Sequence, residues 1–335
     1  MKAIFLCEKE PKIFCVFDQE TCDALEALTG IEKTLYNKEA ILNDPAKFAN
    51  VELVFSTWGM PEFTEEEIKT YLPKLKCVFY GAGSVQKFAR PFLNCGVKVF
   101  SAWAANAIPV AEFTVAQIIL ANKGYFRSTH VYHSTRSKKE AAAAVKSCSG
   151  NYGETVGLIG AGGMIGRLVI QMLKNYHVKV IVCDPFLSQQ QAAELGVEKC
   201  SLEELFERAF VISNHTANNE QTKGMLRYAH FSCMRENAVF INTGRGAQVV
   251  EDDLVRILRE RPDLTALLDV TFPEPPVEDH PFYTLPNCHL TPHIAGSAGD
   301  EVARMGVYML RECEAYLSGA PTKYEVTEKM LETMA

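Results

Sequence analysis

Short apolar runs alternate with amphipathic stretches along most of the 335-residue chain. The runs are rich in Val, Ile and Phe, as expected of buried parallel strands, and the stretches between them have helical spacing. This alternation predicts an α/β fold. Expected strands are Ala3–Leu6, Glu32–Tyr36, Val51–Ser56, Lys76–Tyr80 and Val97–Phe100 in the first part, and Thr155–Ile159, Lys179–Cys183, Phe210–Asn214, Ala238–Asn242, Leu264–Asp269 and His289–Thr291 in the second.

The length predicts two domains, because 335 residues exceed what one ordinary hydrophobic core contains. A long apolar-periodic segment, Pro109–Tyr125, is expected to link them as a helix. The last helical pattern is expected to return to the first domain and make it discontinuous. We therefore expect one domain from 1–104 plus 297–335 and a second from 105–296, each Rossmann-like or flavodoxin-like with a parallel sheet, and a cleft between them.

Composition narrows the function classes. A formal net charge of −7 argues against nucleic acid as a partner, because phosphate binding needs a basic surface. No apolar run approaches the length needed to cross a bilayer, so we expect no membrane partner. The N-terminal Met1–Glu8 has no signal-peptide pattern, which predicts a cytoplasmic protein. The eleven cysteines are scattered without a Cys-x-x-Cys pair, so neither disulfides nor a metal site is expected.

A glycine-rich turn follows the expected strand at Thr155–Ile159 and opens a helix. Glycines there let the backbone approach a dinucleotide pyrophosphate, whose charge is favoured by the N–H groups at the helix start. Asp184 ends the next strand, where a carboxylate accepts hydrogen bonds from a ribose 2′-hydroxyl and repels a 2′-phosphate. We therefore predict NAD (NAD+/NADH) as the cofactor, with turn contacts from Gly160, Gly162, Gly163, Met164 and Ile165.

The spacing of this turn departs from G-x-G-x-x-G. Gly160 and Gly162 are followed by Gly166, one residue later than the pattern allows. Alternatively Gly163 and Gly166 form the last pair, and Ala161 then takes the first place. A glycine turn by itself is also compatible with tight strand–helix packing alone.

Three further segments each begin at the end of an expected strand and carry one chemically useful side chain: Arg245, Glu274 and His293. Ligands bind at the carboxyl ends of parallel strands, so the three side chains are expected to converge near the cofactor. Taken singly, each has an ordinary explanation as a solvated loop residue. Together they form a complementary set.

That set suits the reduction of a 2-keto acid. The forked guanidinium of Arg245 can hold both the carboxylate and the adjacent carbonyl. Hydride arriving at the carbonyl carbon builds negative charge on oxygen, and His293 is placed to donate the proton. A carboxylate from Glu274 on the other ring nitrogen fixes the tautomer and favours the charged imidazole.

Three motifs resemble signatures of the D-isomer-specific 2-hydroxyacid dehydrogenase family. They are Ile241-Asn-Thr-Gly-Arg-Gly, Leu268-Asp-Val-Thr-Phe-Pro-Glu-Pro and Leu290-Thr-Pro-His-Ile-Ala-Gly. The resemblance covers most of the chain, most strongly from Gly153 to Gly296. It implies an NAD-dependent dehydrogenase that interconverts a small 2-keto acid and a D-2-hydroxy acid, with the NAD-binding domain at 105–296 and the substrate-binding domain in the remainder.

The same resemblance implies several finer roles. Asp269 would help to orient the nicotinamide carboxamide, and the backbone at His215–Ala217, which includes Thr216, and at Thr243–Gly244 would line the cofactor cleft. A homodimer would form through the nucleotide-binding domain. The extra residue in the glycine turn departs from the family spacing. Thr291-Pro292 precede the histidine, where formate dehydrogenases of this fold have a glutamine, which favours a hydroxyacid.

Candidate substrate contacts lie in the first domain. The turn Tyr80–Val85 contains consecutive small residues whose N–H groups could cradle a carboxylate, and in the family this turn faces the substrate. We therefore expect contacts from Ala82 and Gly83. Trp58 and Asn106 lie close to the ends of neighbouring strands and are weaker candidates, since tryptophan more often serves packing.

Two other classes remain open. A protein of this fold could bind NAD(H) to sense redox state and regulate a partner, although cofactor binding alone does not require the Arg, Glu and His set. Another enzyme on the same scaffold is the second alternative, for example an amino-acid dehydrogenase or a hydrolase with tightly held NAD. An amino-acid dehydrogenase usually needs a lysine as its acid–base group, and the motifs offer arginine and histidine instead.

Overall fold

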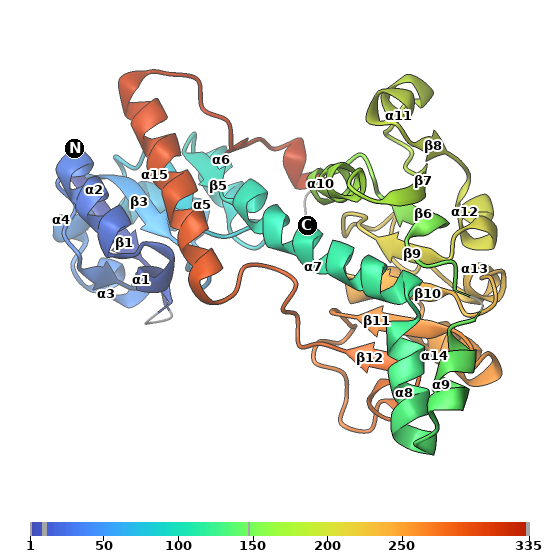
Figure 1. The fold of residues 1–335 in the computed structure, drawn as a ribbon. Coiled ribbons are helices and arrows are strands. Elements are labelled where there is room, and N and C mark those ends of the chain that lie inside the picture. Colours follow the sequence, from blue (N-terminus) through green and yellow to red (C-terminus); the bar gives the residue numbers. More distant parts are fainter. Residues whose placement is uncertain (1, 9–11, 147, 333–335) are drawn as a thin grey trace. The chain divides into compact units, whose positions relative to one another are not determined.

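The structure, a computed structural model, describes residues 2–8, 12–146 and 148–332. The chain divides into two compact units, Met1–Asn106 with Ser297–Ala335 (unit 1) and Ala107–Gly296 (unit 2). Each unit contains its own mainly parallel sheet with helices packed on it (Figure 1). The predicted α/β class with two parallel-sheet domains is confirmed.

Unit 1 has a six-stranded sheet in the order β13-β5-β4-β3-β1-β2. Its strands are β1 (Lys2–Leu6), β2 (Leu35–Tyr36), β3 (Val51–Ser56), β4 (Cys77–Tyr80), β5 (Lys98–Ser101) and β13 (Glu325–Val326). Its helices are α1 (Ile13–Val16), α2 (Gln19–Thr29), α3 (Lys38–Asn43), α4 (Pro45–Phe48), α5 (Glu65–Tyr71), α6 (Ala89–Asn94) and α15 (Ala303–Ser318), with single turns η3 (Gly299–Val302) and η4 (Met330–Glu332). All pairs are parallel except β13 with β5.

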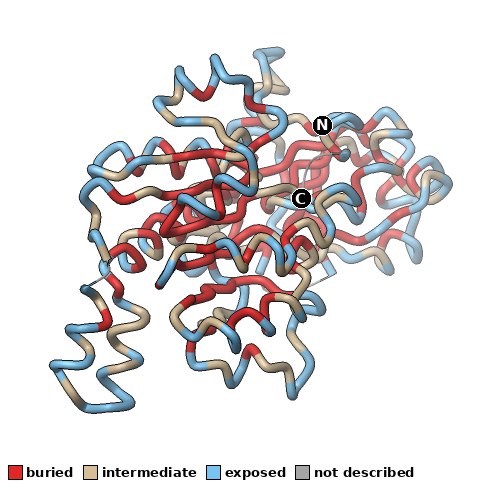
Figure 2. Tube along the Cα trace, turned by 90° about the vertical axis from the view of Figure 1, so that its right-hand side faces the viewer, coloured by how far each residue is buried: buried red, intermediate tan, exposed pale blue. Residues whose placement is uncertain are grey.

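The core of unit 1 is aromatic on one face of its sheet. Phe79 on β4 stacks between Phe55 on β3 and Phe100 on β5, with ring centroids 5.0 and 4.9 Å apart. Met305 and Met309 of α15 belong to the same buried cluster, so this C-terminal helix covers the aromatic face. The strands of this sheet are mostly buried, and Figure 2 shows the buried residues in red along the chain.

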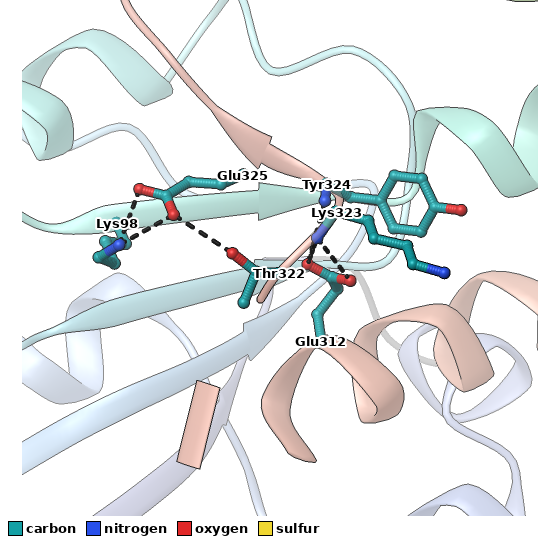
Figure 3. Close-up of polar contacts among 6 residues, drawn as sticks. All are labelled: Lys98, Glu312, Thr322, Lys323, Tyr324 and Glu325. Atoms are coloured by element: carbon teal, nitrogen blue, oxygen red, sulfur yellow. Dashed lines mark hydrogen bonds and ion pairs between the residues drawn. The ribbon is translucent and has the colours of Figure 1, made fainter. Parts of the chain in front are cut away.

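Glu312 on α15 fixes the segment that follows this helix. Its buried carboxylate accepts hydrogen bonds from the backbone N–H groups of Lys323 and Tyr324, at 3.0 to 3.2 Å (Figure 3). These bonds lead the chain to β13, where Glu325 forms an ion pair with Lys98 on β5. The C-terminal segment is thereby added to the edge of the sheet of unit 1.

Unit 2 has a seven-stranded parallel sheet in the order β12-β11-β10-β9-β6-β7-β8. Its strands are β6 (Tyr152–Ile159), β7 (His177–Cys183), β8 (Glu198–Lys199), β9 (Val211–Asn214), β10 (Val239–Asn242), β11 (Thr265–Leu268) and β12 (Cys288–Leu290). Its helices are α8 (Tyr125–Thr135), α9 (Lys138–Ala144), α10 (Met164–Leu173), α11 (Gln189–Leu195), α12 (Leu202–Arg208), α13 (Tyr228–Ser232) and α14 (Glu251–Glu260), with single turns η1 (Gly246–Gln248) and η2 (Pro281–Tyr283). The strand order reverses beside β6, where such sheets bind ligands.

Several element bounds differ from the sequence prediction. The strand expected at Glu32–Tyr36 is reduced to two residues, and Asp269 lies just beyond β11 rather than in it. Two short strands, β8 and β13, were not predicted, because two residues are too few to show a period.

Helix α7 (Trp103–Asn122) begins earlier than expected and contains Pro109, and a second helix, α8, starts after Gly124. By length and composition α7 could cross a membrane, with a mean hydropathy of 1.5 over its most apolar stretch. The prediction that no apolar segment is long enough to cross a membrane is therefore wrong. However, 56% of that stretch is buried within the structure, and a core helix of a soluble protein passes the same test.

Candidate active site

Three glycines shape the turn between β6 and α10 because there is no room for a side chain. Gly160 has φ +78°, and a Cβ there would lie 2.7 Å from the backbone of His215. A Cβ on Gly166 would lie 2.6 Å from the Cα of Ala161, which lets the helix pack directly on the turn. A Cβ on Gly162 would meet the carboxylate of Asp184 at 2.9 Å.

Gly163 is different. It has an ordinary backbone conformation as the N-cap of α10, and a Cβ there would meet only one atom, at 3.6 Å. The spatially required set is thus Gly160, Gly162 and Gly166, so the alternative that gave Ala161 the first place is wrong. The turn accommodates its extra residue just before the helix, where Gly163 and Met164 are exposed.

Asp184 is held firmly at the end of β7. It is 5% exposed, and its two oxygens accept hydrogen bonds from the N–H groups of Gly162 and Phe186, each at 2.7 Å. Each carboxylate oxygen can accept a further hydrogen bond. The arrangement couples the carboxylate to the glycine turn and leaves it able to accept from hydroxyl groups.

His215 borders this turn from the end of β9. Its Nε2 lies 3.0 Å from the hydroxyl of Ser213, while its buried Nδ1 has no hydrogen-bond partner among the described residues. Burial lowers the pKa of His215 from 6.5 to about 4, so the ring is neutral at pH 7. A buried ring nitrogen without a partner beside a glycine cradle fits a site that takes a polar ligand.

A cation that sequence reasoning missed also lies at this turn. Arg167, in the first turns of α10, donates from Nε to the carbonyl oxygen of Gly162 at 2.8 Å. Its guanidinium is exposed, and no acidic group among the described residues pairs with it. The turn, the helix N-terminus, Asp184 and this cation together fit a dinucleotide with free ribose hydroxyls.

The neighbouring strand ends bring the acid–base pair together. Nδ1 of His293 lies 2.5 Å from Oε1 of Glu274, with both side chains partly exposed at 45% and 40%. His293 has φ +57°, a conformation that is costly for a non-glycine residue. The other ring nitrogen, Nε2, remains available for a reacting group.

Asp269 explains how this backbone is held. Its carboxylate, 2% exposed, accepts from the hydroxyl of Thr291 at 2.6 Å and from the N–H groups of Ile294 and Ala295 at 2.9 Å. These donors lie on both sides of His293. Asp269 therefore positions the histidine, a role that sequence reasoning missed; its predicted contact with the nicotinamide stays a prediction.

Arg245 lies beside this pair. Burial lowers the pKa of its guanidinium, and the negative charge of Glu274 opposes that shift. Nη1 donates to the carbonyl oxygen of Gly244 at 2.7 Å, which leaves other N–H groups of the fork for a ligand. The next residue, Gly246, touches the backbone of Thr271 so closely that a Cβ would lie 2.0 Å away.

A buried amide network beneath Arg245 was also missed. Asn214, Asn242 and Gln248 are fully buried, and the amide of Asn214 donates to both of the others. Gln248 accepts from the N–H of Arg245 and donates to the carbonyl of Thr216. The network joins the ends of β9 and β10. The only sign of it in the sequence is a polar residue at each of the three positions.

The remaining predicted positions lie as follows. Thr243 is buried, with its hydroxyl 3.2 Å from that of Thr114, and Gly244 packs against Gln248. Met164 and Ile165 form the first turn of α10. Among the described residues, no group of three or more His, Cys, Asp or Glu side chains could hold a metal ion.

The candidate substrate residues all lie in unit 1, and Gly83 and Asn106 are close to each other. The carbonyls of Ala82 and Gly83 accept from the hydroxyl of Ser101, and the amide of Asn106 would be 3.6 Å from a Cβ on Gly83. Trp58 lies just after β3, the strand next to β4, and its carbonyl contacts the thiol of Cys7. In the described part of unit 1, no hydrogen bond uses the N–H groups of Ala82 or Gly83.

Comparison with known proteins supports one family. Residues 118–295 match the model described as D-isomer specific 2-hydroxyacid dehydrogenase, NAD binding domain. A Bacillus subtilis (strain 168) protein, YoaD, assigned to the 2-hydroxyacid dehydrogenases, is 32% identical over 205 residues, 60% of this chain and 58% of that protein. The D-3-phosphoglycerate dehydrogenase of Archaeoglobus fulgidus is 28% identical over 239 residues, 71% of this chain and 44% of that protein. The chain thus spans about half the length of these curated relatives.

Solved structures show the same fold. A phosphoglycerate oxidoreductase from Rhizobium etli has a TM-score of 0.81 at 21% identity, over 98% of this chain and 99% of that one. A D-isomer specific 2-hydroxyacid dehydrogenase from Lactobacillus delbrueckii ssp. bulgaricus, in its NAD-complexed form, has a TM-score of 0.78 at 18% identity, over 97% of this chain and 100% of that one. At these identities the likeness concerns the fold alone.

Proposed function

The chain belongs to the D-isomer specific 2-hydroxyacid dehydrogenase family, and from this premise we propose that it reduces a small 2-keto acid to the D-2-hydroxy acid, and catalyses the reverse reaction, with NAD. The observation that carries the proposal is the hydrogen bond between His293 and Glu274 at 2.5 Å, formed beside Arg245. A protein that only binds the cofactor does not require this set.

His293 acts as the proton donor in this proposal. Its bond to Glu274 through Nδ1 fixes the ring and directs Nε2 away from the carboxylate. A protonated Nε2 can give its proton to the carbonyl oxygen as negative charge develops there, and the neutral ring takes it back in the oxidation direction. Glu274 stabilises the charged imidazole.

Arg245 serves as the substrate clamp. Its N–H groups not bonded to Gly244 can hold the planar carboxylate in two parallel hydrogen bonds. The half-buried position increases the strength of those bonds, because solvent screens them less.

The bound cofactor supplies the hydride. The residues that would hold it are Gly160, Gly162 and the N-terminal turn of α10 for the pyrophosphate, with Arg167 beside them as a neutralising cation. Asp184 would accept from the ribose hydroxyls and would repel a 2′-phosphate, which favours NAD over NADP.

The proposal extends to substrate contacts, location and oligomeric state. Substrate contacts from Ala82, Gly83, Trp58 and Asn106 stay predictions, as does a cytoplasmic location. We also propose a homodimer through unit 2, because α8 has no buried residue while Tyr125 and Tyr132 on it are 47% and 52% exposed. Sedimentation of the wild type and of Tyr132→Glu tests this: the wild type should be a dimer, and a monomeric wild type would contradict it.

The reaction is tested by following NADH oxidation at 340 nm with purified protein and a panel of 2-keto acids: glyoxylate, pyruvate, hydroxypyruvate, phenylpyruvate and 2-ketoisocaproate. Turnover of at least one member, a D-configured product and a clear preference for NADH over NADPH are expected. NADH binding without turnover of any member would contradict the reaction and favour a redox sensor. Absence of NADH binding would contradict the cofactor assignment.

A further inference from the structure

A second carboxylate–imidazole pair, Glu251 and His280, contacts the loop that carries Glu274. Glu251, the first residue of α14, accepts a hydrogen bond through Oε1 from the backbone N–H of Phe272 at 2.7 Å. Its Oε2 lies 3.6 Å from Nε2 of His280. Both side chains are largely buried, at 12% and 13% exposed, although they belong to different elements of unit 2.

His280 is itself held in one orientation. Its Nδ1 accepts from the N–H of Phe282 at 3.3 Å, as the N-cap of η2, and its ring packs on that of Phe282 with centroids 4.4 Å apart. Because Nδ1 is the acceptor, Nε2 carries the proton, and it faces the carboxylate of Glu251.

Glu251 therefore holds both ends of the segment from Phe272 to His280, and Glu274 lies within that segment. The side chain of Phe272 is 61% exposed and packs little. The Thr271 hydroxyl also ties this end by donating to the carbonyl oxygen of Pro273 at 2.9 Å, and the contact made by Glu251 is its bond from the Phe272 N–H. The bond is formed two residues before Glu274.

From this geometry we infer that Glu251 and His280 are positioning residues, which keep Glu274 in hydrogen-bonding reach of His293. The inference rests on the proposed function, since the benefit is a correctly placed acid–base pair. A displacement of about 1 Å at such a pair can cost on the order of a hundredfold in rate.

The charge environment of Glu251 gives the pair a pH signature. Burial raises the pKa of Glu251 to about 7, the Phe272 N–H opposes this, and Asp252 on the same helix adds to it. The thiol of Cys288 on β12 faces Glu251 as well, and burial keeps it protonated with a pKa of about 12. Among the described residues, no Lys or Arg acts on Glu251 to favour its charged form.

The sign follows from linkage. A carboxyl whose folded pKa exceeds its unfolded value of about 4.3 stabilises the fold at low pH and loses that contribution as pH rises to about 7. Glu251→Gln cannot ionise, yet its amide oxygen can still accept from Phe272. The variant should remove this part of the pH dependence of stability while keeping the anchor.

The experiment compares Glu251→Ala, Glu251→Gln and His280→Asn with Glu260→Ala, an exposed glutamate at the far end of α14. We expect Glu251→Ala to lower kcat on the order of ten- to hundredfold with KM and the NADH Kd within about twofold. Glu251→Gln should restore kcat to within about threefold, His280→Asn should lie between the two, and Glu260→Ala should match the wild type.

A second readout does not need turnover. Hydrogen exchange of peptides covering 270–283 should be faster in Glu251→Ala than in the wild type and should be slow in Glu251→Gln. If Glu251→Ala keeps full kcat, or if it loses NADH affinity and kcat alike, the positioning role is overturned. A wild type without any reductase activity would contradict the proposed function, and the exchange result would then decide alone whether Glu251 anchors this segment.

Discussion

The buried polar side chains at the strand ends of unit 1 are hydroxyls, whereas those at the strand ends of unit 2 include carboxylates, amides and an imidazole. At the ends of β3 and β5, Thr57 and Ser101 donate to the carbonyls of the turn after β4. At the corresponding edge of unit 2, Asp184, Asn214 and Asp269 are buried and hydrogen-bonded.

The distribution of histidine follows the same division. All eight histidines of the chain lie in unit 2. A carboxylate, amide or imidazole at a strand end costs more to bury than a hydroxyl, so each must be matched by donors. The difference supports the proposal that unit 2 holds the reactive groups, while the strand ends of unit 1 would contribute mainly backbone.

The largest effect is expected from a substitution of Arg245 in unit 2. Arg245→Gln removes the charge and one half of the fork, and kcat/KM should fall on the order of a thousandfold, about 4 kcal/mol. Arg259→Gln, on the exposed side of α14, is the matched control and should be unchanged. Steady-state kinetics on the best keto acid measures both; equal values for the two variants would exclude a clamp at Arg245.

Asp269 and Ser101 test the two kinds of strand end directly. Asp269→Asn places an amide N–H against one of three donors and should lower the free energy of unfolding by about 3 kcal/mol, whereas Ser101→Ala should cost about 1 kcal/mol. Urea unfolding followed by circular dichroism and by fluorescence of Trp58 and Trp103, both in unit 1, separates the two units. Similar costs would show that the comparison is mistaken.

The histidines predict a pH dependence confined to unit 2. Burial lowers the folded pKa of His215 to about 4, so its stabilising contribution is present above the unfolded pKa of 6.5 and is lost as pH falls toward 4. The loss should be about 3 kcal/mol at about 1.4 kcal/mol per unit. His215→Asn should flatten the pH profile of unfolding, and His133→Asn on exposed α8 should leave it unchanged. A profile unaffected by either change would argue against a neutral buried imidazole.

The smallest expected effect is a difference in NADH Kd between substitutions of two glycines of the cofactor turn. Gly160→Ala should raise the NADH Kd about tenfold or more, because the new Cβ meets the His215 backbone and the φ angle is positive. Gly163→Ala should change it by less than about twofold, since that position is open. Fluorescence titration with NADH measures both, and comparable losses would mean that the extra residue is part of the phosphate cradle.

The sequence predicted the longer parallel strands, because short apolar runs mark them: Val51–Ser56 is found with the same bounds, and most others differ by one to three residues at an end. It also predicted that Glu274 and His293 come together, which the hydrogen bond between them confirms, while the catalytic roles of Arg245, Glu274 and His293 stay predictions. It could not show that Asp269 holds the His293 backbone or that Glu251 reaches Phe272, since these contacts join residues 21 to 26 positions apart. Helix α7 begins six residues before the predicted segment Pro109–Tyr125, because the apolar spacing on which the prediction rests does not mark where a helix starts.

The most direct test of the account compares hydride transfer and cofactor binding in one variant. His293→Asn should bind NADH with the wild-type Kd, because the side chain lies outside the glycine turn, while single-turnover oxidation of bound NADH by the best keto acid slows on the order of a hundred- to ten-thousandfold. Unchanged single-turnover rates would contradict His293 as the proton donor and, with it, the proposed reaction mechanism.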